Sequence, residues 1–384
     1  RIMEPVIQWD VATVQTPAFV VEEQLLRNNL ERLKQVKEAT GCKILLAQKA
    51  FSMYYFYPLL ANYLDGTTAS GIYEARLGFE EFGGETHVFS PAYRPEEFTE
   101  VLPLCDHVIF NSLSQWQQFK KEALASGKSL GLRINPECST QEGHAIYDPC
   151  APGSRLGILA SELTAGDLVG IDGLHFHTLC EQNSDDLVTT LQAVEEKFGH
   201  YLPQMKWLNF GGGHHITRKD YDIETLIEAI HHIQDTYQVT VYLEPGEAVA
   251  LNAGYLVAQV LDITQNHGIT NAILDTSATC HMPDVLEMPY RPFVVGSGEA
   301  QEKQYTYRFG GPTCLAGDII GDYSFDTPLT IGSKVIFCDM AIYSMVKTNT
   351  FNGMPLASIL AVDNHQRITT VKAFGYETFK DRLS

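Results

Sequence analysis

The sequence predicts an α/β fold in two parts. Residues 25–245 are expected to form a parallel (β/α)8 TIM barrel, and residues 1–24 together with 246–384 a second domain, like a β-sandwich or β-barrel. Through about the first 250 residues, short apolar runs alternate with amphipathic stretches, as in βαβ units. After Glu244, strand-like runs separated by Gly and Pro turns take over. The alternation also fits an open, doubly wound sheet.

The apolar runs of the first part have the length of buried strands. They cover residues 43–47, 107–110, 130–134, 173–177, 207–210 and 241–244. Amphipathic stretches between them predict helices over residues 112–126, 185–202 and 223–237. For the second domain, strands are expected over residues 16–21, 248–264, 272–276, 303–309, 334–337 and 359–374.

The composition narrows the classes of partner. Lys and Arg number 27 against 47 Asp and Glu, a formal net charge of −20. Such a surface repels nucleic acid and anionic membranes and attracts polycations, although solubility alone would also explain it. We therefore expect neither a nucleic-acid nor a membrane partner.

Two further features predict a cytoplasmic protein. No apolar run reaches the ~18 residues of a membrane span, and the N-terminal stretch lacks the apolar core of a signal peptide. The eight cysteines are scattered without a Cys-x-x-Cys pair. This pattern indicates reduced thiols rather than a disulfide framework or a zinc knuckle.

Candidate site residues follow the strands, because a parallel barrel carries its active site at the carboxyl ends of its strands. Lys49 is either a surface lysine or a desolvated, nucleophilic amine. The glycines at 211–213 form either a flexible turn or a phosphate-binding backbone. Glu244, before Pro-Gly, is either a solvated loop acid or a carboxylate that keeps a pyridine nitrogen protonated.

Histidine and cysteine residues add further candidates. His175 and His177 allow three interpretations: polar residues at a strand end, a His-x-His metal pair, or an aromatic ring that stacks on a flat cofactor. Cys314, on a glycine-rich turn, is either an exposed proton donor or a structural thiol. Asp318 follows four residues later, and Tyr343 lies in a polar, aromatic loop.

Taken together and in order, these motifs resemble one family, the barrel-type pyridoxal-phosphate decarboxylases, which include ornithine and diaminopimelate decarboxylases. The resemblance spans nearly the whole chain, and the ordered set is more specific than any single motif. It implies an alanine-racemase-like barrel (PLP fold type III). Within the family, residues 177–181, 244–247 and 311–318 most resemble the carboxynorspermidine decarboxylases, which also act on carboxyspermidine in polyamine biosynthesis.

The resemblance implies pyridoxal 5′-phosphate as the cofactor. Lys49 would hold it as a Schiff base, His177 would stack on the ring, and Glu244 would hold the ring proton. The phosphate would be bound by Gly211, Gly212 and Gly213, with help from Gly246 and Tyr343. No metal ion is expected in this site.

The resemblance also implies an active homodimer. Cys314 would protonate the substrate carbon after carbon dioxide leaves, and Asp318 would face the distal amines, both from the partner subunit. The substrate would be a polyamine-like amino acid. Glu181 and Glu247 are further candidates to pair with its ammonium groups, each exposed pair contributing ~1 kcal/mol or less.

Three positions depart from the ornithine-type pattern. Glu247 stands where those enzymes carry an arginine that helps bind phosphate, and Cys180 where they carry a serine that contacts it. Leu315 replaces the acid that follows the catalytic cysteine, which argues against short substrates such as ornithine.

The sequence is also compatible with other functions. The substrate could be another basic amino acid: diaminopimelate, ornithine, lysine or arginine. A metal-dependent barrel hydrolase would use His175 and His177 as ligands, with His214 and His215 nearby. A non-catalytic relative would be expected to have lost Lys49 or Cys314, and both are present.

Overall fold

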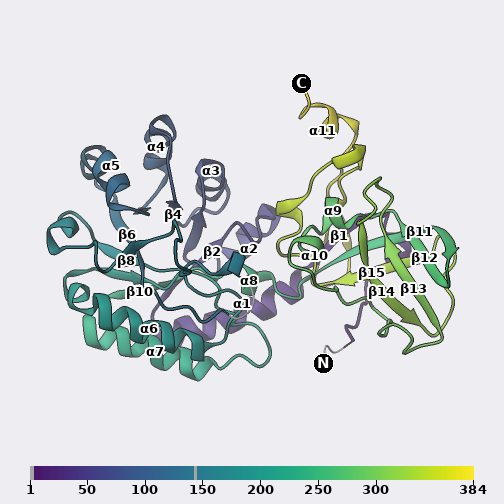
Figure 1. Ribbon diagram of the computed structural model, residues 1–384, viewed down its shortest axis with the longest axis horizontal. Helices are drawn as coiled ribbons and strands as arrows, with labels where there is room; N and C mark the ends of the chain where they lie inside the picture. Colours follow the sequence, from purple (N-terminus) through teal and green to yellow (C-terminus); the bar gives the residue numbers. More distant parts are fainter. Residues whose placement is uncertain (1–3, 142–144) are drawn as a thin grey trace. The chain divides into compact units, whose positions relative to one another are not determined.

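Strand pairing closes the first part of the chain into a barrel (Figure 1). The computed structural model describes residues 4–141 and 145–384, and within these residues eight strands pair in parallel, each with the next. The path ends at β5 and β6, which pair with each other. The barrel is therefore confirmed, and the open doubly wound sheet is excluded. Its strands are β2 (Lys43–Ala47), β3 (Gly66–Ala69), β4 (Glu85–Ser90), β5 (His107–Phe110), β6 (Ser129–Asn135), β8 (Gly173–His175), β9 (Trp207–Asn209) and β10 (Thr240–Leu243).

All six strands predicted for the barrel are present, whereas β3 and β4 were not expected. Their sequences are Gly-Thr-Thr-Ala and Glu-Thr-His-Val-Phe-Ser, so polar side chains break the apolar signal. Lack of space explains the glycine at the start of β3. A Cβ on Gly66 would lie 2.0 Å from the carbonyl oxygen of Glu85 on the neighbouring strand, so that only glycine fits there.

Amphipathic helices connect the barrel strands, as the helical periodicity predicted. The side chains of Ser112 and Asp222 cap α5 and α7 by accepting hydrogen bonds from backbone N–H groups in the first turn. Between β6 and β8, the described residues form the short strand β7 (Ile158–Leu159) and the 3-10 helices η4 (Ala145–Tyr147) and η5 (Ala165–Leu168). The α-helices are α1 (Glu23–Thr40), α2 (Tyr57–Leu60), α3 (Ile72–Glu81), α4 (Pro95–Val101), α5 (Leu113–Ala125), α6 (Ser184–Phe198), α7 (Ile223–Tyr237) and α8 (Glu247–Ala250). Further 3-10 helices are η2 (Tyr54–Phe56), η3 (Leu102–Leu104) and η6 (Gly199–Gln204).

The second part is a mixed sheet built from both ends of the chain. Strand β1 pairs antiparallel with β11 and parallel with β16, so an N-terminal strand lies between strands from the last third of the chain. The sheet order is β14-β13-β12-β11-β1-β16-β17, with β15 also paired to β11. Its strands are β1 (Ala18–Glu22), β11 (Gly254–Asn266), β12 (Ile269–Leu274), β13 (Tyr305–Gly310), β14 (Ile319–Phe325), β15 (Lys334–Cys338), β16 (Ser358–Val362) and β17 (Ile368–Lys372). The short helices here are η1 (Val11–Thr13), α9 (Ala278–His281), α10 (Asp284–Glu287), η7 (Met345–Lys347), η8 (Phe351–Gly353) and α11 (Tyr376–Lys380).

Two strand predictions for this part need correction. The strand expected from residue 248 begins only at Gly254, because Glu247–Ala250 forms the short helix α8. The strand expected over residues 359–374 is two strands, β16 and β17, joined by a turn. Strand β14, with its alternating burial, was not predicted.

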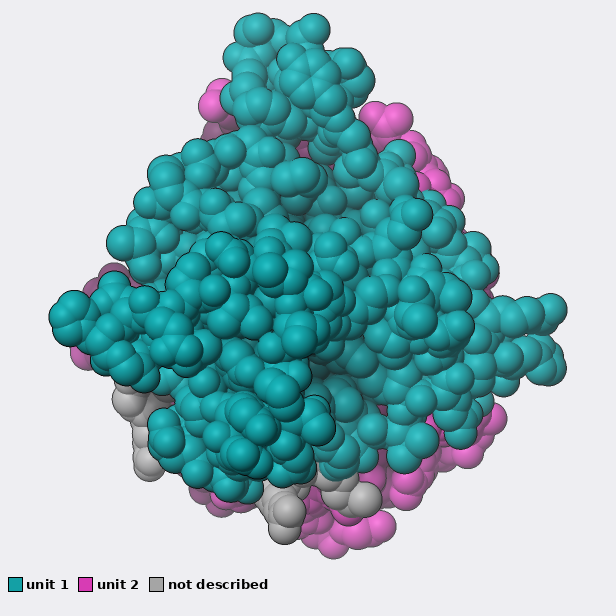
Figure 2. Space-filling model, turned by 90° about the vertical axis from the view of Figure 1, so that its right-hand side faces the viewer, with its two compact units in different colours: residues 1–27, 250–384 teal, residues 28–249 magenta. Residues whose placement is uncertain are grey.

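The chain divides into two units, which Figure 2 colours separately. We call residues 28–249 the barrel unit, and residues 1–27 with 250–384 the sheet unit. All eight cysteines are free, so neither unit contains a disulfide. Among the described residues, none of the helices combines the length and apolarity that crossing a bilayer would require.

Candidate active site

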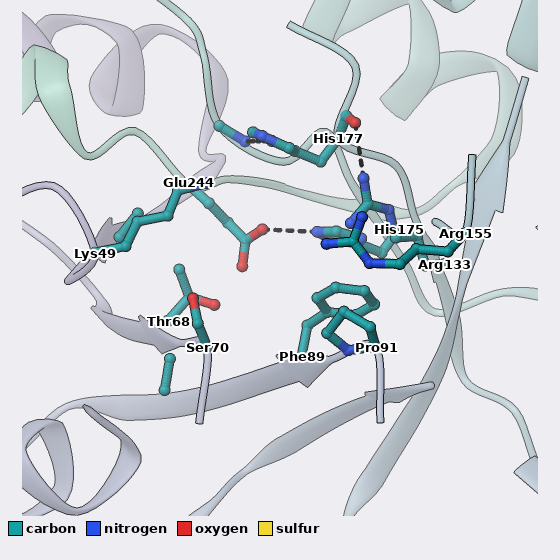
Figure 3. Close-up of a pocket in the computed structure, with 13 residues that line it drawn as sticks. Lys49, Thr68, Ser70, Phe89, Pro91, Arg133, Arg155, His175, His177 and Glu244 are labelled. Atoms are coloured by element: carbon teal, nitrogen blue, oxygen red, sulfur yellow. Dashed lines mark hydrogen bonds and ion pairs between the residues drawn. The ribbon is translucent and has the colours of Figure 1, made fainter. Parts of the chain in front are cut away.

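The carboxyl ends of the barrel strands surround a cavity of about 310 Å³ (Figure 3). Lys49 follows β2, His177 follows β8, Gly212 follows β9 and Glu244 follows β10, and all four line this cavity. The rest of its wall consists of Ala47, Thr68, Ala69, Ser70, Phe89, Pro91, Arg133, Arg155 and His175. The barrel thus gathers side chains that are separated by up to about 200 positions in the sequence.

Lys49 carries the one primary amine of the cavity wall. Its side chain is accessible from the open cavity, yet protein atoms enclose it on most sides. This loss of hydration lowers the pKa of the Lys49 amine below its usual value of 10.5, although the Glu244 carboxylate acts in the opposite direction. A lowered pKa increases the fraction of neutral amine, which is the nucleophilic form.

Glu244 is buried and forms a hydrogen bond with His175, whose Nε2 lies 2.8 Å from Glu244 Oε1. Burial by itself would raise the pKa of Glu244, but its interactions with His175, Thr68 and His87 together outweigh burial and lower this pKa from 4.5 to about 2. Burial also lowers the pKa of His175. At neutral pH, Glu244 is therefore an ionised carboxylate, and its Oε1 accepts a hydrogen bond from Nε2–H of the neutral His175 imidazole.

The second oxygen of Glu244 is available. Oε2 is buried and accepts no hydrogen bond from any described residue. A buried carboxylate oxygen without a partner costs free energy, so its place in the cavity wall indicates that a bound molecule supplies a donor. Figure 3 shows the carboxylate between Lys49 and the imidazole of His175.

His177 is held on two sides. Its Nδ1 accepts a hydrogen bond from the backbone N–H of Gly212 at 2.9 Å, and its carbonyl oxygen accepts one from Arg133 Nη2 at 3.1 Å. Burial keeps the pKa of His177 well below 6.5, and the charges of Lys49 and Arg133 act in the same direction. The ring is therefore neutral, with its proton on Nε2, and presents a flat face of fixed orientation.

The glycines after β9 adopt conformations that other residues avoid. Gly211 has φ +68° and Gly213 has φ +81°. A Cβ on Gly213 would also lie 2.0 Å from the carbonyl oxygen of Leu179. Only glycine satisfies both conditions, so this loop keeps its backbone amides close to the cavity.

Arg133 and Arg155 were not predicted as site residues. Arg133 lies in β6, where it is buried, and its guanidinium lies 4.8 Å from the centre of the Phe89 ring. Burial lowers the pKa of Arg133 to about 10, so it stays protonated. An arginine inside the apolar run 130–134 was the signal in the sequence, but its partners come from distant segments.

The metal-ligand interpretation of His175 and His177 is not supported. His175 is engaged by Glu244, and Nδ1 of His177 by Gly212. Neither belongs to a group of three or more potential metal ligands in the described part of the chain.

Three other expected site residues are not part of the barrel unit. Cys314, Asp318 and Tyr343 belong to the sheet unit. Cys314 is exposed. Asp318 is buried, and its Oδ2 accepts hydrogen bonds from Ser277 Oγ at 2.8 Å and Thr313 Oγ1 at 2.7 Å. These contacts hold the Asp318 carboxylate within the glycine-rich turn.

Glu181, Glu247 and Gly246 belong to the barrel unit but do not line the cavity. Glu181 is exposed at the loop after β8. Glu247 begins α8, and its Oε1 lies 3.9 Å from His215 Nε2. Gly246 packs against β2, because a Cβ there would lie 2.8 Å from the carbonyl oxygen of Ala47.

Known proteins share both the sequence and the fold. A family model described as "Pyridoxal-dependent decarboxylase, C-terminal sheet domain" matches residues 19–341. A carboxynorspermidine/carboxyspermidine decarboxylase of Campylobacter jejuni is 43% identical over 380 residues, which cover 96% of this chain and 98% of the relative. A carboxyaminopropylagmatine decarboxylase of Synechocystis is 42% identical, covering 97% of this chain and 96% of the relative.

The crystal structure of carboxynorspermidine decarboxylase from Campylobacter jejuni, in complex with norspermidine, superimposes with a TM-score of 0.91. It is 42% identical and covers 96% of this chain and 100% of its own. The fold and the comparisons indicate the same family. The closed parallel barrel and the lysine and carboxylate of its cavity are what such a decarboxylase requires. The chain belongs to the pyridoxal-dependent decarboxylase family.

Proposed function

We propose that this enzyme decarboxylates carboxynorspermidine to norspermidine, and carboxyspermidine to spermidine. The observation that carries the proposal is the cavity in which the Lys49 amine and the ionised Glu244 carboxylate face the same space. The substrate assignment is supported by the Campylobacter jejuni relative, which matches along nearly the whole chain.

The cavity residues fit pyridoxal 5′-phosphate, the cofactor of this family. Glu244 Oε2 is a buried acceptor without a partner, as a protonated pyridine nitrogen requires. The neutral ring of His177 offers a stacking face, and the loop Gly211, Gly212 and Gly213 would bind the phosphate with its backbone amides. Gly246 and Tyr343 would assist there. When bound, the cofactor accepts the electron pair that the departing carboxylate leaves behind.

The protein residues have separate tasks in this scheme. Lys49 would hold the cofactor covalently. His175 helps to keep Glu244 ionised, so that Glu244 would hold a proton on the cofactor nitrogen. Arg133 fixes the segment of His177 by its bond to the carbonyl oxygen, and thereby holds the stacking ring in place.

Protonation of the substrate carbon is assigned to Cys314. Its exposure in the single chain is compatible with delivery to the cavity of a second copy, and we propose a homodimer whose sites combine Lys49 of one chain with Cys314 of the other. Asp318 of the second copy is proposed to face the distal amines of the substrate, with its Oδ2 positioned by Ser277 and Thr313.

The substrate carries several ammonium groups, which suits an acidic protein of net charge −20. Glu181 and Glu247 are proposed to pair with them, and each exposed pair contributes ~1 kcal/mol or less. Eight free cysteines are compatible with a reducing compartment, and we propose that the enzyme acts in the cytoplasm.

A second substrate is favoured by a specific observation. The carboxyaminopropylagmatine decarboxylase of Synechocystis is 42% identical along almost the whole chain, nearly the same as the first relative. That substrate would end in a guanidinium group rather than an ammonium group.

A substrate panel tests the proposal. Carbon dioxide release and amine products would be measured with carboxynorspermidine, carboxyspermidine, carboxyaminopropylagmatine, diaminopimelate and ornithine. We expect kcat/KM to be highest for carboxynorspermidine or carboxyspermidine. Preferential turnover of carboxyaminopropylagmatine would support the second candidate, and preferential turnover of diaminopimelate or ornithine would overturn both.

A further inference from the structure

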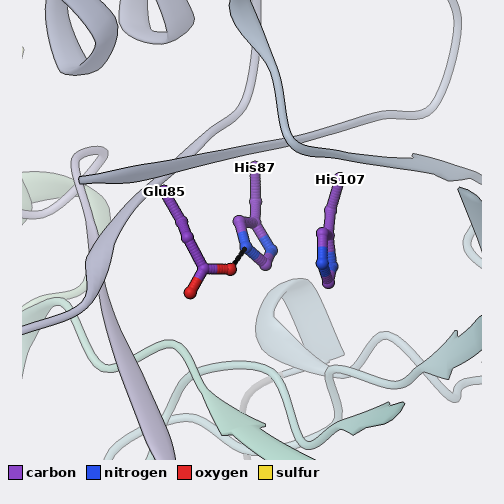
Figure 4. Close-up of side chains that lie close together, drawn as sticks. All are labelled: Glu85, His87 and His107. Atoms are coloured by element: carbon purple, nitrogen blue, oxygen red, sulfur yellow. Dashed lines mark hydrogen bonds and ion pairs between the residues drawn. The ribbon is translucent and has the colours of Figure 1, made fainter. Parts of the chain in front are cut away.

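A second group of ionisable side chains lies inside the barrel, away from the active-site cavity. Glu85 and His87 belong to the beginning of β4, and His107 is the first residue of β5. The cavity lies at the carboxyl ends of the same parallel strands, so this group occupies the opposite, amino-terminal end. Figure 4 shows the three side chains next to one another.

The group has the dimensions of a metal site. One carboxylate oxygen of Glu85 and one nitrogen from each histidine lie within 4.8 Å of one another. The distance from Glu85 Oε1 to His87 Nε2 is 3.2 Å. Two ligand atoms bound to one tetrahedral zinc ion lie roughly 3.3 Å apart, given metal–ligand bonds of about 2.0–2.1 Å. The two imidazole rings stack with their centres 4.0 Å apart and their planes at 30°, so one ring must turn out of the stack before both can direct a nitrogen at the same ion.

Both histidines have an unused ring nitrogen. Nδ1 of His87 and Nδ1 of His107 are buried and have no hydrogen-bond partner among the described residues. His87 itself has no exposed surface. Buried imidazole nitrogens normally find a partner, because leaving one without costs free energy. In His87 the nitrogen that faces Glu85 is Nε2, so Nε2 would be the ligand atom and Nδ1 would carry the ring proton.

Neighbouring side chains hold the carboxylate in position. Lys43 Nζ lies 2.9 Å from Glu85 Oε2, and the Tyr242 hydroxyl donates to Glu85 Oε1 at 2.8 Å. The Trp207 ring stacks on His107 with ring centres 4.7 Å apart. Such outer contacts orient ligands around a metal ion.

We propose that Glu85, His87 and His107 bind one divalent transition-metal ion of the zinc type. Two imidazoles and one carboxylate form a donor set that zinc accepts, whereas Mg²⁺ and Ca²⁺ prefer oxygen ligands alone. The ion would join β4 to β5 at the amino-terminal end of the barrel. Because the site is separate from the cavity, its role is to stabilise the barrel rather than to take part in decarboxylation.

The test uses the holoenzyme, first treated with a chelator and then dialysed against ZnCl₂. Elemental analysis should find one zinc ion per chain, and zinc should raise the unfolding temperature. His107→Gln should lose the bound zinc. Tyr242→Phe keeps the ring packing and removes only the hydroxyl bond to Glu85, and it should weaken zinc binding by about 10–100-fold.

His232→Ala is the matched control. His232 contacts a carboxylate, Glu195, at 2.8 Å, but it lies on the exposed face of α7 and belongs to no group of three such ligands in the described chain. Its zinc content should equal that of the unaltered protein. Cofactor absorbance would verify that each variant folds. The proposal is overturned if the unaltered protein binds no stoichiometric zinc, or if both His107→Gln and Tyr242→Phe bind zinc as tightly as the control does.

Discussion

Glu244 is the residue on which the electronic environment of the cavity depends most. Its carboxylate is ionised because His175, together with Thr68 and His87, lowers its pKa to about 2 in spite of burial. An isolated buried carboxyl group would instead take up a proton, and could no longer hold a positive charge on a cofactor nitrogen. The short contact of 2.8 Å to His175 is therefore part of the chemistry, although His175 itself is assigned no contact with substrate.

Replacing the Glu244 carboxylate by an amide tests whether its negative charge is needed for catalysis. Glu244→Gln should lower kcat by on the order of 100-fold, as expected when a preorganised charge is lost from an active site. Lys49 should still carry the cofactor, so the visible absorbance should persist. Steady-state kinetics and absorbance spectra check both results. Glu195→Gln, on the surface of the barrel unit, serves as the control and should keep normal kcat.

The same residue predicts a pH dependence of stability. The pKa of Glu244 is about 2 in the folded chain and about 4.5 when unfolded. The unfolded chain therefore binds more protons between these values, and the stabilisation, present above pH ~4.5, is lost as the pH falls towards 2. It amounts to about 3 kcal/mol at 1.36 kcal/mol per pKa unit.

Urea unfolding from pH 6 downward measures this effect. The free energy of unfolding should fall more steeply in the unaltered protein than in Glu244→Gln, because the amide does not titrate. Parallel curves for the two proteins would show that the hydrogen bond between Glu244 and His175 is not maintained in solution.

At the scale of elements, the loop after β9 has a shape that requires glycine. Gly213 has φ +81°, and a Cβ there would collide with the carbonyl oxygen of Leu179. Gly83, after α3, has almost the same φ of +82° but has open space around it. Substitutions at Gly83 and Gly213 therefore separate two contributions to the free energy of unfolding. Only the backbone conformation contributes at Gly83, whereas the steric collision contributes as well at Gly213.

Gly83→Ala should lower the free energy of unfolding by about 1–2 kcal/mol, the usual cost of a left-handed conformation, and leave cofactor affinity unchanged. Gly213→Ala should cost more and also weaken binding of pyridoxal 5′-phosphate to the apoenzyme. Fluorescence titration with the cofactor and thermal unfolding distinguish the two variants. Equal cofactor affinity in both would show that the loop does not contact the phosphate.

The barrel elements differ in how well the sequence revealed them. Strands β2, β5 and β6 are buried on both faces and were recognisable as apolar runs. Strand β4 places Glu85 and His87 inside the barrel, where their partners come from β5 and β10, and such pairing leaves no local periodicity. Arg133 and Phe89 were missed as cavity residues for the same reason. Lys49, His177 and Glu244 were found because each follows a recognisable strand.

For the whole molecule, the origin of the proton donor decides how many chains make one active site. The cavity contains Lys49 and Glu244, whereas Cys314 belongs to the sheet unit and is exposed. In a symmetric dimer, both copies of a shared site are equivalent. Two inactive variants that lack different residues of a shared site could then form an active mixed dimer.

Mixing the Lys49→Ala and Cys314→Ala variants tests whether two chains share each active site. If each site takes Lys49 from one chain and Cys314 from the other, every mixed dimer has one intact site, and random exchange restores about a quarter of the unaltered activity. Each variant alone should be inactive or strongly impaired in amine production. Failure of the mixture to regain activity, when exchange of subunits has been verified by mass spectrometry, would place both residues in a single chain's site.

The most direct test concerns the covalent bond between Lys49 and pyridoxal 5′-phosphate. Borohydride reduction of the cofactor-saturated enzyme, followed by proteolysis and mass spectrometry, should find the pyridoxyl group on the peptide that contains Lys49. Lys49→Ala should yield no such peptide and no turnover. A pyridoxyl group on a different lysine, or no adduct in an enzyme that still releases carbon dioxide, would contradict the account.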